Sequence, residues 1–446
     1  MIPIIEFQER ALNGPVMKSD EFDLEFSMKI RELVKKYNIE YNENELVVDD
    51  DTADAVYQAA VELLAEVGIY HMDTERVIKL TREEIEEVAG EYRGNPGRHT
   101  FGKGKDQVTV EYRASTDKRP PTLYAGSWGV AKEEWYKPYI KSFVQEEAIE
   151  AMGITAGLAN LGNVRAKAGT PSEVIVGLWE NESVKEVVEE VGRPGMHLGL
   201  LATLSSAGGI MTVVGAGFRD AHNTQIGVHI IPEMKISWSQ FVLAHYCQLR
   251  GIQPWQSSMS MIGGLCRNAA DAAVGLTANL LGQLSYAQGQ LCSLFTNHMD
   301  GKSATKPTHW AFSAAARASE RNIKVCIGGC AAGVLCKSPF TLIQAVNMAS
   351  LFTASGMSYC WIAGNTGIEA RYTGEVMNAI AGMEREQANE LINNMMELQQ
   401  KYAPEVKGNT CKFPDVYDLE TVKPHGWYVD YIEKAKEELA SCGVPY

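Results

Sequence analysis

Three histidines and one glutamate stand where this sequence could carry acid–base chemistry. His197, His229 and His298 lie inside or at the end of short apolar runs typical of strands, and Glu233 comes just after the run that contains His229. Imidazole titrates near neutral pH and burial raises the pKa of a carboxyl, so such a set could move a proton during a reaction. We predict Glu233, His229, His197 and His298 as catalytic residues, with a hydrogen-bonded structural role as the alternative for each histidine.

Common signatures of phosphate binding and of serine nucleophiles are missing from the sequence. The glycine- and lysine-rich run at residues 102–105 has no following serine or threonine, and no serine has the flanking glycines of a nucleophile elbow. The nine cysteines are scattered, and their tightest group is Cys326, Cys330 and Cys336. Zinc sites usually pair their cysteines more closely, so we predict buried, reduced thiols there, with a ligand role as the alternative.

The composition is typical of a well-cored globular protein with an acidic surface. The chain has 446 residues, 45% of them hydrophobic, and a formal net charge of −15. Negative charge without a basic run removes the electrostatic attraction to nucleic acid and to anionic lipid. The N-terminus has no basic region followed by an apolar stretch, and no run of about 20 apolar residues occurs. We expect a cytoplasmic protein without a nucleic-acid or membrane partner.

Short apolar runs alternate with helix-length amphipathic stretches beyond residue 97. The runs are Leu123–Trp128, Ile154–Leu161, Met196–Leu204, Gln225–Pro232, Pro254–Ile262, Gln290–His298, Ile323–Ile327 and Met357–Ala363. The helix candidates between them include Gly177–Val191, Trp238–Arg250, Asn268–Leu284, Thr308–Glu320 and Ser338–Phe352. Repeated β/α alternation favours an α/β fold, a closed (β/α)8 TIM barrel, over the alternative of an open doubly wound sheet. Glycines and polar residues follow the runs, which is where barrel enzymes carry their chemistry.

Both ends of the chain are predicted to be helical additions to the barrel. An apolar-periodic stretch opens at Asp51 and ends at Gly68, and Thr81 with Glu84 forms a capping box for a second helix. We take residues 1–97 as an N-terminal helical layer, 98–380 as the barrel, and 381–446 as C-terminal helices packed on it.

Several segments occur in the order found in one enzyme family. They are residues 63–76, Gly192–Met196, Pro232–Ile236, Ala244–Tyr246 and Gly367–Val376. Together, over nearly the whole chain, they resemble the monomethylamine:corrinoid protein methyltransferases. The resemblance implies a TIM barrel that transfers a methyl group to the Co(I) of a corrinoid (cobalamin) carried by a separate protein, which docks over the barrel mouth. It also implies a symmetric homo-oligomer.

The sequence departs from that family where the substrate would bind. Amine-active members carry pyrrolysine shortly after the Arg-Pro-Gly-Met motif, and the corresponding position here is Gly199. A second family carboxylate would fall in Gln256–Met259, where no acid occurs, whereas the first matches Glu233. We interpret the glycine as opening volume in the mouth for a donor larger than monomethylamine.

The predicted substrate-binding residues suit a methylated donor with an aromatic ring. They are Gly199, Trp255, Ser257, Asn297, Trp128 and Trp361, with Phe295 as a further surface for a flat ring. We favour a methoxylated aromatic compound, with a quaternary amine in an aromatic cage as the alternative. Glu233 with a nearby histidine would act as general acid for the leaving oxygen, or would bind a Zn²⁺ that polarises it.

Two other classes of function stay open. One is a stand-alone metal-dependent lyase or hydrolase that uses His229, Glu233 and His298. The other is a non-catalytic partner of corrinoid proteins that keeps the barrel after losing the catalytic residue.

Overall fold

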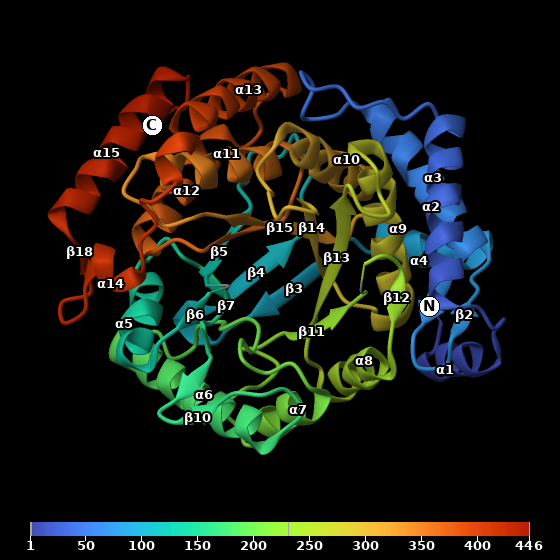
Figure 1. Ribbon diagram of the computed structural model, residues 1–446, viewed down its shortest axis with the longest axis horizontal. Helices are drawn as coiled ribbons and strands as arrows, with labels where there is room; N and C mark the ends of the chain where they lie inside the picture. The colour runs from blue at the N-terminus through green and yellow to red at the C-terminus, as the bar shows by residue number, and fades with distance from the viewer. Residues whose placement is uncertain (1, 128, 231, 446) are drawn as a thin grey trace.

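Seven parallel strands curl around a common axis at the centre of the computed structural model, which describes residues 2–127, 129–230 and 232–445 (Figure 1). Neighbouring strands follow the order β11-β13-β14-β15-β16-β5-β7. Their bounds are β5 (Thr122–Gly126), β7 (Ala151–Ile154), β11 (Ile226–His229), β13 (Pro254–Ile262), β14 (Leu291–His298), β15 (Cys326–Ala332) and β16 (Tyr359–Ala363).

An irregular stretch at residues 197–200 fills the gap between β7 and β11 and closes the ring. On one side Leu200 forms a parallel bridge with Ile154 of β7. On the other side the backbone N–H of Gln225, just before β11, donates to the carbonyl of Gly199 at 3.2 Å. This stretch is the eighth member of the ring, which confirms the predicted TIM barrel and excludes the open sheet.

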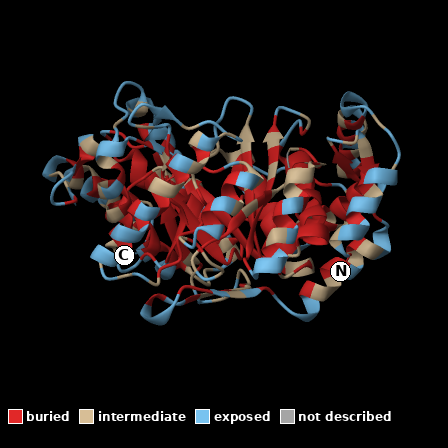
Figure 2. Cartoon of the chain, turned by 90° about the horizontal axis from the view of Figure 1, so that it is seen from below, coloured by how far each residue is buried: buried red, intermediate tan, exposed pale blue. Residues whose placement is uncertain are grey.

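Helices alternate with the members of the ring and surround them. They are α5 (Glu133–Val144), α6 (Pro171–Glu190), α7 (Ala207–Gly215), α8 (Trp238–Arg250), α9 (Ala269–Ala287), α10 (Lys306–Asn322), α11 (Phe340–Ala354) and α12 (Gly367–Ile380). Figure 2 shows buried residues through the centre and exposed ones on the outer helix faces and loops. Helix α9 differs because all of its residues are buried, with β13 on one side and N-terminal helices on the other.

The predicted ends of helices and strands agree best with those of the structure where the apolar pattern in the sequence is uninterrupted. Strand β13 and helix α8 span the predicted residues. Strand β7 begins at Ala151, before the predicted Ile154, and β15 continues to Ala332, beyond the predicted Ile327. The predicted strand Met196–Leu204 is not a regular strand, because Gly199 turns the backbone into the left-handed region with a φ of +65°.

The N-terminal layer combines helices with a small sheet. Its helices are α1 (Ile4–Asn13), α2 (Ser19–Lys36), α3 (Asp50–Val67) and α4 (Arg82–Gly94). Its sheet contains β1 (Ile69–His71), β2 (Arg76–Ile78) and β12 (Lys235–Ile236), in the order β12-β1-β2. Because β12 follows β11 in the chain and pairs with β1, the sheet fastens the layer to the segment that carries Glu233. The layer is therefore not purely helical.

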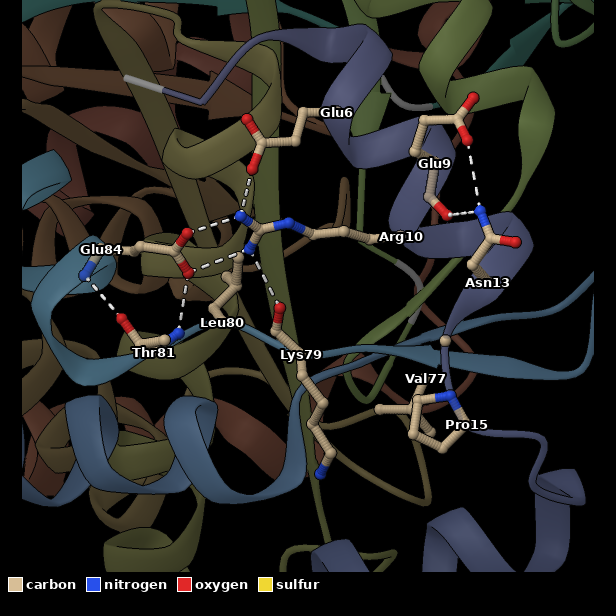
Figure 3. A pocket seen from close by; sticks show the side chains of 11 residues that line it. Glu6, Glu9, Arg10, Asn13, Pro15, Val77, Lys79, Leu80, Thr81 and Glu84 are labelled. Carbon is tan, nitrogen blue, oxygen red and sulfur yellow. Dashed lines mark hydrogen bonds and ion pairs between the residues drawn. The ribbon is translucent and has the colours of Figure 1, made fainter.

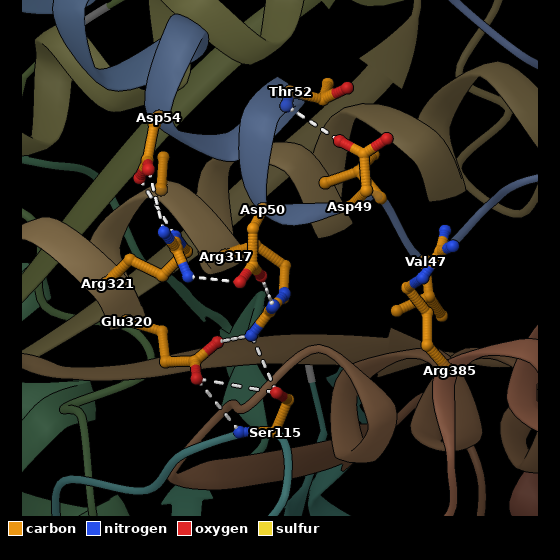
Figure 4. Close-up of polar contacts among 12 residues, drawn as sticks. Val47, Asp49, Asp50, Thr52, Asp54, Ser115, Arg317, Glu320, Arg321 and Arg385 are labelled. Carbon is orange, nitrogen blue, oxygen red and sulfur yellow. Dashed lines mark hydrogen bonds and ion pairs between the residues drawn. The ribbon is translucent and has the colours of Figure 1, made fainter.

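Ion pairs join the elements of the layer to each other and to the barrel. In Figure 3 the guanidinium of Arg10 on α1 contacts the carboxylate of Glu84 on α4 at 2.5 Å. In Figure 4 Arg321 of α10 contacts Asp54 of α3 at 2.7 Å, and the neighbouring Arg317 contacts Asp50 at 2.5 Å. The second group ties α3 to the outer ring of the barrel.

A β-hairpin covers the N-terminal end of the barrel. It consists of β3 (Arg98–Phe101) and β4 (Val108–Glu111), joined through the short helix η1 (Gly104–Asp106), and it crosses the centre of the ring in Figure 1. Phe101 belongs to the inner apolar cluster together with Leu291 and Cys326, the first residues of β14 and β15. The hairpin therefore closes this end, and the lumen opens at the C-terminal ends of the strands.

The C-terminal helices pack on the outer ring. Helices α13 (Arg385–Tyr402) and α15 (Gly426–Ser441) contact α11, and α14 (Phe413–Val416) contacts α5. The remaining short elements are β6 (Val130–Ala131), β8 (Gly157–Leu158), β9 (Asn160–Leu161), β10 (Val164–Arg165), β17 (Tyr417–Asp418), β18 (Lys423–Pro424) and η2 (Ala403–Val406). None of the helices in the described ranges combines the length and apolarity that a membrane span requires.

Replacement of Gly199 by alanine should weaken the closure of the barrel. An added Cβ would lie 2.2 Å from the carbonyl oxygen of Gly153, in a backbone that already has a φ of +65°. We expect the free energy of unfolding, measured in urea, to fall by about 2 kcal/mol or more. Gly208→Ala is the control, because a Cβ there meets no atom within 4 Å. Equal stability of the two variants would contradict this account of the closure.

Candidate active site at the barrel mouth

The upper part of the lumen is lined by side chains that point inward from β11, β13 and β14. Side chains alternate along a strand, and Trp255 belongs to the inner apolar cluster, so every second residue beyond it on β13 faces the same lumen. The strand register sets residues of β11 and β14 beside them. We call these partly exposed side chains the lumen residues: His229, Ser257, Met259, Met261, Phe295 and Asn297.

His229 and Ser257 form a hydrogen-bonded pair in the lumen. The imidazole Nδ1 lies 2.8 Å from the Ser257 Oγ. The ring folds over Gly227, where an added Cβ would come within 2.5 Å of Nε2, so the glycine makes room for it. Burial lowers the pKa of His229 to about 4, so the imidazole is neutral at neutral pH. The pair is therefore a neutral hydrogen-bonding group.

Glu233 lies in the wall of the barrel. It is buried, and its Oε1 accepts a hydrogen bond from the backbone N–H of Met261 at 2.9 Å, beyond the point where β11 has ended. Its carboxyl also interacts with the thiol of Cys266, whose sulfur lies close to Gly275 of α9. Burial raises the pKa of Glu233 above its usual value. In the described part of the chain no hydrogen bond joins Glu233 to a histidine.

The other two predicted catalytic histidines lie at opposite ends of the barrel. His197 is at the closed end, where its ring packs on Phe101 at 4.0 Å between centroids with the planes tilted by 32°, and its Nε2 lies 3.1 Å from Gln225 Oε1. His298 is at the rim, with its Nε2 2.8 Å from Thr305 Oγ1, in a shallow cavity of about 440 Å³. The structure does not bring the four predicted residues together, because each is positioned by a different part of the barrel.

The tryptophans predicted to hold a flat ring are mostly elsewhere. Trp255 and Trp361 are buried and pack against each other at 5.5 Å between ring centroids, in a layer with Tyr124 and Tyr359. They fill the lower barrel instead of lining its mouth, which corrects that prediction for both. Trp128 lies outside the described residues. Ser257, Asn297 and Phe295 do line the upper lumen.

Gly199 does not open space for a substrate. Its missing side chain would point at the backbone of β7, with the carbonyl oxygens of Gly153 and Met152 at 2.2 and 2.5 Å from an ideal Cβ. The interpretation of this glycine as a pocket-forming residue is therefore wrong. Its role is the close approach of two chain segments.

Metal ligation finds no support in the described residues. They contain no group of three or more histidine, cysteine, aspartate or glutamate side chains placed to hold one ion. The zinc considered for Glu233 and a histidine therefore has no ligand set in this part of the chain, and we derive no step through it. Cys326, Cys330 and Cys336 are buried free thiols, as predicted.

Met259 and Met261 were missed as lumen residues. The signal was available, because Trp255, Ser257 and these two methionines alternate along one uninterrupted apolar run. Gly227 was missed as well, since nothing in the sequence indicates that a ring two residues further along folds back over it.

Comparisons with known proteins agree with one another. A family described as "Monomethylamine methyltransferase MtmB" matches residues 2–444. Monomethylamine methyltransferase MtmB of Methanosarcina mazei is 28% identical over 99% of this chain and 98% of that protein. MtmB2 of Methanosarcina acetivorans is 27% identical with the same coverage. The crystal structure of Methanosarcina barkeri MtmB has the same fold, with a TM-score of 0.92 at 24% identity over 100% of this chain and 99% of that chain.

The low pKa of His229 predicts a pH-dependent contribution to stability. Below pH 6.5 the imidazole is protonated in the unfolded chain, whereas in the folded protein, with a pKa of about 4, it stays neutral. Protons therefore bind preferentially to the unfolded chain, and the free energy of unfolding decreases as pH falls. The variant His229→Asn can still hydrogen-bond Ser257 but does not titrate in this range. Between pH 7.5 and 5.5 we expect the free energy of unfolding of the parent to fall by about 1.4 kcal/mol relative to that of the variant. His245→Asn, on an exposed face of α8, is the control. A difference between parent and variant that stays constant with pH would contradict the enclosed, neutral ring.

Proposed function

The chain belongs to the monomethylamine methyltransferase family, and on that premise we propose that it moves a methyl group from a small donor, held in the upper lumen, to the Co(I) of a corrinoid carried by a separate protein. The observation that carries the proposal is a barrel interior closed at one end by the β3–β4 hairpin and lined toward the other end by partly exposed side chains, among them the His229–Ser257 pair. Such a site holds a donor in a fixed orientation beneath the mouth, from which a corrinoid protein can approach its methyl group.

We propose a methyl ether as the donor, whose methyl-bearing end carries no charge, with a methoxylated aromatic compound as the candidate. None of the six lumen residues carries a carboxylate or a cationic group, and the imidazole of His229 is neutral. A methylammonium ion would find no carboxylate among them, and the raised pKa of Glu233 in the barrel wall favours the neutral acid over a counter-charge. Met259, Met261 and Phe295 offer soft apolar surface, which suits an aromatic ring better than an ion.

The His229–Ser257 pair would assist departure of the ether oxygen. If the serine hydroxyl donates to Nδ1, the N–H at Nε2 remains to donate. If Nδ1 donates to the serine oxygen, the serine hydroxyl remains. In both tautomers one donor can hydrogen-bond the oxygen as negative charge develops on it. The corrinoid of the partner protein supplies the nucleophile, and this chain orients the donor and excludes water.

Glu233 is the proposed general acid, as its match to a family carboxylate suggests. Support comes from its raised pKa, while its hydrogen bond to Met261 gives it a second role in holding the end of β13. Glu233→Gln keeps an oxygen for that bond but removes the acid, so a full methyl-transfer rate in this variant would leave only the anchoring role.

The donor class is tested by a spectroscopic assay with the full-length protein and a Co(I) corrinoid protein. Separate reactions contain monomethylamine, glycine betaine or a methoxybenzoate, and the loss of the Co(I) absorbance is followed. We expect a signal with the methoxybenzoate alone. A signal with either amine alone would move the donor to that class. Silence with all three, together with a tightly bound metal, would favour the lyase or hydrolase alternative.

Ser257→Ala should slow methyl transfer without unfolding the protein. It removes the partner of His229 in the lumen, so we expect the rate to fall by roughly 10- to 100-fold. Ser258→Ala is a matched control, because that neighbouring hydroxyl faces the helices and donates to the carbonyl of Leu276 at 2.7 Å. Equal rates in the two variants would remove the pair from the reaction.

A further inference from the structure

A cavity lies at the barrel mouth, beside the C-terminal ends of β5 and β7. It has a volume of about 350 Å³ and lies between the turn after β5 and the hairpin formed by β9 and β10. Its wall includes Ile154, which belongs to the inner apolar cluster of the barrel, and Ala202, which packs against the same cluster as the lumen residue Phe295 does. The cavity therefore borders the barrel interior at the C-terminal ends of β5 and β7.

The charge of this cavity sets it apart from four other cavities among the described residues. Arg165 and Lys167 line it, and the described lining residues include no acid. Four other cavities on the described surface each contain at least one carboxylate. No carboxylate of the described chain forms an ion pair with Arg165 or Lys167, although the protein has a net charge of −15. The cavity thus has positive charge that the described chain does not neutralise.

The backbone that carries these two cations is held in place. Within the hairpin, Arg165 pairs with Asn160, and the N–H of Ala166 donates to the carbonyl of Ala159 at 2.9 Å. The buried carboxylate of Glu180 on α6 accepts from the backbone N–H of Leu158 at 2.7 Å, at the base of the same segment. The backbone from which the two cationic side chains extend is therefore fixed beside the cavity.

We propose that this cavity binds an anionic group, a carboxylate, at the far end of the methyl donor. The inference rests on the proposed function and narrows the donor to an anionic methyl ether, whose methoxy end lies in the lumen. A guanidinium binds a carboxylate through two parallel hydrogen bonds, and the ammonium of Lys167 adds a second charge. Both side chains are exposed, so the attraction is weakened by salt.

The test compares two donors of nearly the same shape, para-methoxybenzoate and the uncharged para-methoxybenzamide. It uses the full-length protein with its corrinoid partner, and a double variant, Arg165→Gln with Lys167→Gln. We expect the KM for the benzoate to rise about 10-fold with kcat retained, and the KM for the amide to stay unchanged. Lys132→Gln and Lys302→Gln, whose cavities contain carboxylates, are the controls and should leave both values unchanged.

Other outcomes would overturn the assignment. Equal changes for both donors, no change for either, or a higher KM for the corrinoid protein would each remove the anion site. Calorimetric titration with para-methoxybenzoate separates this failure from failure of the proposed function. If neither donor is turned over, benzoate binding that the double variant loses still supports the site, and equal or absent binding in both proteins overturns it.

Discussion

Closure of the barrel between β7 and β11 depends on main-chain hydrogen bonds made by residues 197–200, and the geometry of the mouth depends on that closure. The stretch replaces a regular strand because Gly199 brings its backbone against that of Gly153. Beyond it, buried Glu180 and Glu173 of α6 accept hydrogen bonds from the backbone of Thr203 and from that of Ser205 and Ser206. Burying a carboxylate is costly unless it is fully hydrogen-bonded, so these bonds fix the course of the chain beside the lumen.

The barrel interior has two levels with different physical character. The lower level is packed with aromatic rings and closed by the β3–β4 hairpin. The upper level has hydroxyl, amide and thioether groups that remain partly exposed. His229 lies between them, enclosed enough to stay neutral and open enough to hydrogen-bond Ser257. The chemistry we propose needs this combination, since a charged imidazole would favour a different class of donor.

Much of the fold could be predicted from the sequence, and much less of the site. Alternating or helical patterns are local, so the bounds of β13 and α8 and the sequence of β/α repeats could be predicted. The direction of a side chain within a closed barrel depends on residues far away in the chain. Glu233 therefore turned out to lie in the wall, and His197 under Phe101. Gly199 is a further example. From the sequence alone, a glycine is compatible both with open space for a ligand and with the close approach of two backbone segments.

The complete burial of α9 has a consequence for how this protein is made. Its sequence has no solvent-facing side, since α2 and α3 cover the surface that an outer barrel helix usually exposes. During synthesis α2 and α3 leave the ribosome long before α9. Their apolar surfaces that pack on α9 in the folded protein therefore remain partly exposed until α9 has been synthesised. The barrel therefore cannot be shortened to its α/β repeats without leaving an apolar helix in water, and tolerance to mutation along α9 should be low on every face.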